Sequence, residues 1–167
     1  MLCGAGNLLA SGEFQYTGNF RLGWNIGGER LAYSELNIIT ETNGGHVNNV
    51  KLIDYLDQAR KVWYQYCILL GVEAVVVHLG ADFKKEVFNH EKLLVQTGLE
   101  RVGNTSFTLM QSILKDGKEL VMSAEVILTT INRETRRKVT VPDDVRMMLK
   151  IDSVLNDEYL SQVNGIN

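Results

Sequence analysis

The chain has 167 residues, 45% of them hydrophobic and 22% charged, which is typical of one globular domain with a sizeable core. Its net charge of −3 leaves no basic excess that would favour nucleic acid or an anionic membrane as a partner. No apolar run approaches the roughly 20 residues of a membrane span, and the first cation, Arg21, comes too late for a signal peptide. Cys3 and Cys67 read as free thiols in a reducing cytosol, so we expect a cytoplasmic protein.

Residues 1–28 form a glycine-rich N-terminal segment. Seven of the fifteen glycines fall here, together with four aromatic residues at a spacing typical of a loose hairpin: Phe14, Tyr16, Phe20 and Trp24. Two alternatives follow for this segment, an added strand pair or a poorly ordered arm.

A strand candidate over residues 31–39 precedes a long helix. Apolar residues recur every three or four positions and predict a helix over residues 50–70: Leu52, Leu56, Ala59, Trp63, Cys67 and Leu70. Val50 and Ile53 widen this stripe, so we expect neighbouring elements to enclose the helix. Gly71 is suited to end it.

The chain becomes strand-like after Gly71. Strand candidates cover residues 75–83, 93–102, 106–115 and 119–131, and the Asp116-Gly117 pair is a strong hairpin signal. In the last strand apolar residues alternate with a mixed set, as in a sheet that is covered on one face: Met122, Ala124, Val126 and Leu128.

Residues 143–167 form a C-terminal tail after Pro142. We expect Asp143 or Asp144 to cap a short helix through Leu149, and the remainder is either one more helix or disordered. One strand, one long helix and four antiparallel strands predict an α+β fold. We expect a curved antiparallel sheet wrapped around one long central helix.

The residues most suggestive of a functional site lie in the turn before the long helix, Gly44-Gly45-His46-Val47-Asn48-Asn49. Two glycines permit a tight turn, an imidazole follows, and two asparagines offer oxygens to the open amides of a helix start. This pattern has two interpretations, a small-molecule site or a well-capped helix.

Residues 46–60, which read HVNNVKLIDYLDQAR, resemble the opening of the central helix in hotdog-fold thioesterases. The similarity is to the 4-hydroxybenzoyl-CoA thioesterase-like group and, in HVNNVK, to acyl-carrier-protein thioesterases. It extends from residue 31 to residue 142, through Asp82-Phe83 and Asp116-Gly117. The resemblance implies a hotdog domain over residues 29–142 and hydrolysis of an acyl-CoA or acyl-carrier-protein thioester without a cofactor. It also implies a homodimer or homotetramer with sites between subunits.

The resemblance assigns the thioester carbonyl to backbone amides near Gly44, Gly45 and His46, with Asn48 and Asn49 bracing the turn. The family's aspartate position holds Thr42 here, and threonine is a poor general base. Four residues remain as catalytic candidates. Glu41 is the nearest carboxylate, Asn43 takes the aspartate's place if the turn is one residue shorter, and Asp57 matches the helix carboxylate of many relatives. His46 is the fourth, either a base or a turn-packing donor, and Asp57 is either the base or an ion-pair partner of Arg60 or Lys61.

Two cationic clusters are candidates for binding CoA phosphates, Lys84 with Lys85, and Arg136 with Arg137; solvated charge is the alternative. The histidines and cysteines show no metal-ligand spacing. Two other functions stay open: a non-catalytic acyl-CoA-binding hotdog protein, which Thr42 favours, and a hotdog hydratase or dehydratase.

Overall fold

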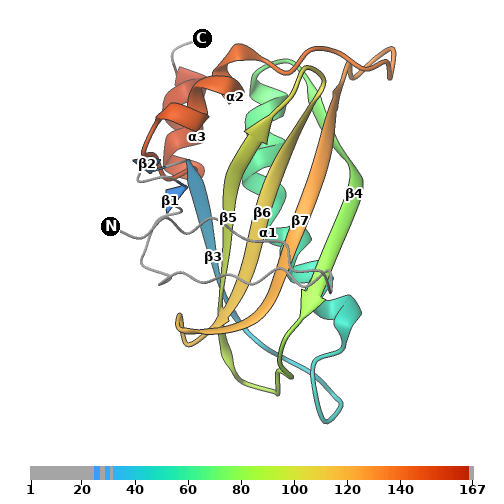
Figure 1. The fold of residues 1–167 in the computed structure, drawn as a ribbon, viewed down its shortest axis with the longest axis vertical. Coiled ribbons are helices and arrows are strands. Elements are labelled where there is room, and N and C mark those ends of the chain that lie inside the picture. Colours follow the sequence, from blue (N-terminus) through green and yellow to red (C-terminus); the bar gives the residue numbers. More distant parts are fainter. Residues whose placement is uncertain (1–24, 27–28, 31, 166–167) are drawn as a thin grey trace, which may run out of the picture.

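The computed structural model describes residues 25–26, 29–30 and 32–165 (Figure 1). Strands β1 (Asn25–Ile26) and β2 (Glu29–Arg30) form a short antiparallel pair. The hairpin or arm expected from the aromatic residues before Asn25 lies outside the described residues.

Five strands form one antiparallel sheet in the order β3-β5-β6-β7-β4. Their bounds are β3 (Tyr33–Ile39), β4 (Glu73–Phe83), β5 (Lys92–Val102), β6 (Ser106–Lys115) and β7 (Glu119–Ile131). Each predicted strand is therefore confirmed to within a few residues. The order leaves β3 and β4 as the two edges of this sheet.

The predicted turn at Asp116-Gly117 and the predicted helix end at Gly71 are both observed. Asp116 and Gly117 both have positive φ, 49° and 67°, and form a tight turn in the three-residue connection between β6 and β7, which the Lys118 amide closes by donating to the Lys115 carbonyl (3.0 Å). Gly71 has φ of 84° and follows the last residues of the helix, so it uses the freedom that only glycine has there without strain.

Helix α1 (Asn49–Leu69) has 21 residues and runs along one face of the sheet (Figure 1). Its C-terminal half packs with Leu99, Leu109 and Leu128 of the sheet, and its N-terminal half packs with Val95 and Ile113. The inward set of β7, Met122, Ala124, Val126 and Leu128, belongs to the same two clusters, as predicted. Burial of this apolar surface is the main force that holds α1 on the sheet.

The expectation that neighbouring elements enclose α1 is wrong. Val50 is 76% exposed and Ile68 is 41% exposed, and the polar residues between them on the same side of the helix, Asp54, Asp57, Lys61 and Gln65, are exposed too. We call these six residues the open stripe of α1. Val50, which together with Ile53 widened the predicted apolar stripe, is not covered by any part of the described chain, and neither is Ile68.

The C-terminal segment is helical and packed. Helix α2 (Asp143–Met147), the 3₁₀ turn η1 (Met148–Lys150) and helix α3 (Asp157–Gly165) follow one another, so of the two alternatives for the tail a helix is observed through residue 165. The expected aspartate cap is wrong, because Pro142 holds the N-cap position and no side chain caps α2. Val145, Met148, Leu155 and Leu160 join Trp63 in one core cluster. These elements lie at the end of the sheet where α1 finishes (Figure 1).

Candidate active site

The turn before α1 is held by hydrogen bonds that use Thr42. The Thr42 hydroxyl accepts a hydrogen bond from the Gly44 amide (3.1 Å), and the Thr42 amide donates to Oδ1 of Asn89 (3.0 Å). Thr42 therefore braces the loop, which a neutral hydroxyl can do.

The two glycines of the turn are not required by its backbone. Neither Gly44 nor Gly45 is among the residues with positive φ. A Cβ at Gly45 would meet nothing within 4 Å, and one at Gly44 would make only ordinary contacts near 3.8 Å. The turn therefore does not need glycine at either position, and the space over Gly45 is open.

Helix α1 begins with a side-chain cap. Oδ1 of Asn48 accepts a hydrogen bond from the Lys51 amide at 2.8 Å, which is the N-cap interaction expected of this residue. The Val47 amide donates to the Val87 carbonyl at 2.7 Å and fixes the turn to the segment after β4. The remaining amides of the first helical turn have no acceptor in the helix, so they form a positive end that favours oxygen or negative charge.

A cavity of about 260 Å³ opens at this helix start, between the turn and the segment after β4. Its lining mixes apolar and charged residues: His46, Val47, Asn49, Leu52, Phe83, Lys84, Lys85, Glu86 and Val87. The structure thereby brings together four of the predicted site residues, His46, Asn49, Lys84 and Lys85. Glu86 was missed, because an exposed glutamate in a loop follows no periodic pattern that would distinguish it.

The catalytic candidates other than His46 do not line this cavity. Glu41 and Asn43 are exposed beside the turn, and neither side chain makes a hydrogen bond or ion pair with another described residue. Asp57 is on the open stripe, eight residues along α1 from Asn49, which corresponds to about 12 Å at 1.5 Å per residue. Its side chain is 53% exposed, so the burial expected for it is wrong.

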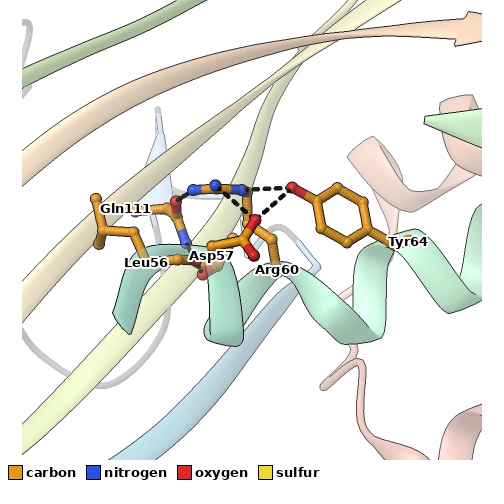
Figure 2. Close-up of polar contacts among 6 residues, drawn as sticks. Leu56, Asp57, Arg60, Tyr64 and Gln111 are labelled. Carbon is orange, nitrogen blue, oxygen red and sulfur yellow. Dashed lines mark hydrogen bonds and ion pairs between the residues drawn. The ribbon is translucent and has the colours of Figure 1, made fainter. Parts of the chain in front are cut away.

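Asp57 belongs to a polar network around a buried arginine (Figure 2). The Arg60 guanidinium donates from Nη2 to Oδ1 of Asp57 (3.1 Å), from Nη1 to Oε1 of Gln111 (2.6 Å) and from Nε to the Tyr64 hydroxyl (2.9 Å). The Tyr64 hydroxyl donates in turn to Oδ1 of Asp57 at 3.1 Å. Of the partners proposed for Asp57, Arg60 is therefore the one observed.

Burial raises the pKa of Tyr64 above its ordinary value although Arg60 lowers it, so its hydroxyl stays protonated and remains a donor. Sequence reasoning missed Tyr64 and Gln111. A signal existed for Gln111, since it occupies an inward position of β6 between Leu109 and Ile113, where a polar residue needs a buried partner.

The cationic clusters stand at opposite ends of β4. Lys84 and Lys85 follow its last residue and pair with Asp82 and Glu119, whereas Arg136 binds Glu73 at the first residue of β4 (2.7 Å). Eleven residues of strand span about 36 Å, so one chain does not bring the two clusters together.

In the described part of the chain no group of His, Cys, Asp or Glu could hold a metal ion. None of the described helices is long and apolar enough to cross a membrane.

The sequence profile of the Thioesterase-like superfamily matches residues 39–149, which include the turn, α1 and strands β4 to β7. The chain belongs to this superfamily. The comparison with curated proteins gives no match.

Solved thioesterase structures share the fold at low sequence identity. A predicted thioesterase from Bacillus stearothermophilus is 22% identical with a TM-score of 0.62, over 70% of this chain and 93% of that one. DHNA-CoA thioesterase from Staphylococcus aureus is 17% identical with a TM-score of 0.60, over 81% and 95% of the two chains. A mutant 4-hydroxybenzoyl-CoA thioesterase, bound to 4-hydroxybenzoyl-CoA, is 19% identical with a TM-score of 0.61, over 70% and 98%. The five-stranded antiparallel sheet with its helices agrees with the hotdog fold of these thioesterases.

Proposed function

We propose that this protein is a thioesterase that hydrolyses an acyl-CoA or acyl-carrier-protein thioester to a carboxylic acid and a free thiol. The cavity at the start of α1 carries this proposal, because it combines unpaired helix-start amides with a mixed apolar and cationic lining in a chain of the thioesterase-like superfamily. In this proposal α1 is the central helix of a hotdog domain over residues 29–142. The protein acts in the cytoplasm, where the free Cys67 thiol stays reduced.

In the proposed reaction the carbonyl oxygen of the thioester accepts hydrogen bonds from backbone amides near Gly45 and His46. These amides and the positive end of α1 stabilise the oxyanion that forms when water attacks the carbonyl carbon. A carboxylate takes the proton from that water. The C–S bond then breaks, and the departing thiolate recovers the proton as the free thiol, so no cofactor is consumed.

Asp57 is the carboxylate that we favour. Its separation of about 12 Å from Asn49 puts it out of reach of a carbonyl at its own turn. It lies on the open stripe of α1, where a second subunit can approach, so we place it opposite the turn of that subunit. Glu41, and Asn43 as a group that orients water, are the rival positions beside the turn itself.

A homodimer joined through β4 fits this arrangement. Strand β4 is an eleven-residue edge with Val77 58% exposed, whereas the other edge, β3, is bridged at Tyr33 by Val154. Antiparallel pairing of two β4 edges covers both sets of unpaired backbone groups. It also places the end of one β4, with Lys84 and Lys85, beside the start of the partner's β4, with Arg136. We propose that the four cations Lys84, Lys85, Arg136 and Arg137 bind the phosphates of one CoA across this interface.

Mixing experiments test the shared phosphate site. The double variants Lys84→Ala/Lys85→Ala and Arg136→Ala/Arg137→Ala each raise KM for acyl-CoA as homodimers. In a heterodimer of the two variants, one of the two shared sites keeps all four cations and the other has none. The heterodimer is therefore expected to show the wild-type KM and roughly half of the wild-type kcat. Heterodimers with the KM of the parent variants contradict a shared site, and light scattering that shows only an 18.8 kDa species contradicts the dimer.

Carboxylate variants test the assignment of the base. Asp57→Asn lowers kcat by about 10²-fold or more if Asp57 activates water, and Glu41→Gln carries that loss if Glu41 does. Asn43→Asp raises the rate if Asn43 stands where the family has its acid. Wild-type kcat in both carboxamide variants, with folding intact, contradicts a carboxylate mechanism and directs attention to His46.

A binding protein without turnover is the second candidate. The use of Thr42 as a loop brace favours it, since the family's acid is absent from the turn. Saturable acyl-CoA binding with no thiol release identifies this function.

A further inference from the structure

Arg60 is a buried cation whose nitrogens are all engaged. Only 3% of the residue is exposed, and Nε, Nη1 and Nη2 each donate one hydrogen bond, to Tyr64, Gln111 and Asp57 respectively (Figure 2). A guanidinium in this setting cannot rotate without breaking several bonds at once. Its orientation is therefore set by the protein and not by solvent.

Gln111 fixes Arg60 from the side of the sheet. Its Nε2 group donates to the Leu56 carbonyl (3.0 Å) and to the Thr97 hydroxyl (2.8 Å). Because both of these oxygens accept, the amide nitrogen must face them and the amide oxygen must face Arg60. One turn of α1 and two strands, β5 and β6, thus hold the guanidinium in place.

On its other side Arg60 holds only one oxygen of the Asp57 carboxylate. Oδ1 accepts hydrogen bonds from both Arg60 and Tyr64, whereas Oδ2 has no partner among the described residues. An aspartate on the open stripe of a helix would otherwise move among several rotamers. Here one oxygen is anchored and the other stays available at the surface.

Stability alone does not explain such a group. Burying a guanidinium has a desolvation cost that its contacts can at best cancel. An apolar side chain of similar volume at such a position commonly gives a protein that is equally stable or more stable. Arg60 also pairs with a half-exposed carboxylate, which gains little from an ion pair in contact with water. A role in fixing the position of that carboxylate accounts for both features.

We propose that Arg60 is a positioning residue for catalysis: anchored through Gln111, it holds Oδ1 of Asp57 so that Oδ2 faces the reacting water in a fixed orientation. This inference rests on the proposed thioesterase function and on Asp57 as its base. Arg60 itself does not touch the substrate in this scheme.

A double-mutant cycle tests the proposal with the purified full chain. Arg60→Gln lowers kcat by about 10-fold, with KM within about twofold of wild type, because misorientation of the base affects the chemical step alone. In an Asp57→Asn background the same substitution lowers kcat no further. Arg146→Gln is the matched control. It removes another hydrogen-bonded arginine, which donates to the Gly103 carbonyl (2.7 Å) and pairs with Asp143 outside the open stripe, and it leaves kcat unchanged.

Three outcomes overturn the positioning role. They are wild-type kcat in Arg60→Gln, an equal fall of kcat in both backgrounds, and wild-type kcat in Asp57→Asn. If Arg60→Gln does not fold, Arg60→Lys enters the same cycle, since one ammonium nitrogen cannot reproduce the planar guanidinium whose three nitrogens reach Tyr64, Gln111 and Asp57.

Crystal structures separate this inference from the proposed function. If the wild-type protein releases no thiol, the function is refuted and the position of Asp57 decides the remaining question. One Asp57 rotamer in the wild type and several in Arg60→Gln support positioning. The same single rotamer in both proteins overturns it.

Discussion

Gln111→Leu is expected to be the most informative stability variant of this protein. Gln111 is fully buried and makes three hydrogen bonds, to Arg60, to the Leu56 carbonyl and to the Thr97 hydroxyl. Leucine fills a similar volume but can replace none of these bonds. The Leu56 carbonyl keeps its helical partner, whereas Nη1 of Arg60 and the Thr97 hydroxyl are left buried and unpaired.

The magnitude follows from those two groups. An unpaired buried hydroxyl costs about 1–3 kcal/mol, and breaking a buried charged contact by removing one partner costs about 3–5 kcal/mol. Because some contacts relax, we expect a total loss of about 3–5 kcal/mol in the free energy of unfolding. At about 2–4 °C per kcal/mol for a chain of this size, Tm falls by roughly 6–20 °C.

Urea unfolding followed by far-UV circular dichroism and by tryptophan fluorescence measures this loss, at one protein concentration because assembly shifts apparent stability. Ser112→Ala is the matched control. Ser112 is the next residue of β6 and its buried Oγ finds no hydrogen-bond partner within the described chain, so its removal changes stability by no more than about 0.5 kcal/mol or increases it. In Arg60→Met/Gln111→Leu the stranded charge is gone, so the double variant recovers about 2 kcal/mol relative to Gln111→Leu.

A loss below about 1 kcal/mol in Gln111→Leu refutes the reasoning, because it means that Arg60 is not held from the sheet. A double variant that is as unstable as the sum of the two single variants refutes it as well. That result shows that shape, and not unpaired charge, determines the cost.

The other predictions concern the helix start and the buried thiol. Asn48→Ala removes the N-cap of α1 and lowers the free energy of unfolding by about 1 kcal/mol, measured by urea unfolding, with Asn48→Ser restoring most of it. Burial raises the pKa of Cys67 to about 12, so in a Cys3→Ser protein at pH 8 a thiol reagent labels Cys67 only after unfolding; rapid labelling of the native protein contradicts this. Since the folded pKa lies above the unfolded one, the contribution of Cys67 to stability is complete below about pH 8.5 and is lost as the pH rises towards 12, whereas Cys67→Ala lacks this dependence.

Much of the fold was predictable because local and tertiary preferences agree. The 3.6-residue period from Leu52 to Leu70, the alternation in β7 and the Asp116-Gly117 turn each correspond to an observed element. The open stripe of α1 was not predictable in this way. Val50 and Ile68 are apolar but exposed, and periodicity alone cannot distinguish a residue that faces the core from one that faces a further surface.

The candidate site was predictable only in part. The Asn48 cap follows from a turn that leads into a helix. The meeting of His46 and Asn49 with Lys84 and Lys85 at one cavity was not predicted, because the two lysines follow β4 and only the tertiary fold brings them to the turn. The pairing of Asp57 with Arg60 was one of the expected alternatives, whereas the burial of Arg60 and its contacts with Gln111 and Tyr64 were missed, because charged residues on a helix usually face water. The network depends on Gln111, which is 51 positions from Arg60 along the chain, and only the tertiary fold brings these two side chains into contact.

Release of free thiol from acyl-CoA by the purified full chain tests the central claim most directly. A thiol reagent follows the reaction over short, long and aromatic acyl groups, with Asp57→Asn as the paired variant. The account predicts saturable release above the uncatalysed rate for at least one acyl group, with kcat lower by about 10²-fold or more in Asp57→Asn. Saturable binding without release across the whole panel contradicts it and identifies the protein as an acyl-CoA-binding member of its superfamily.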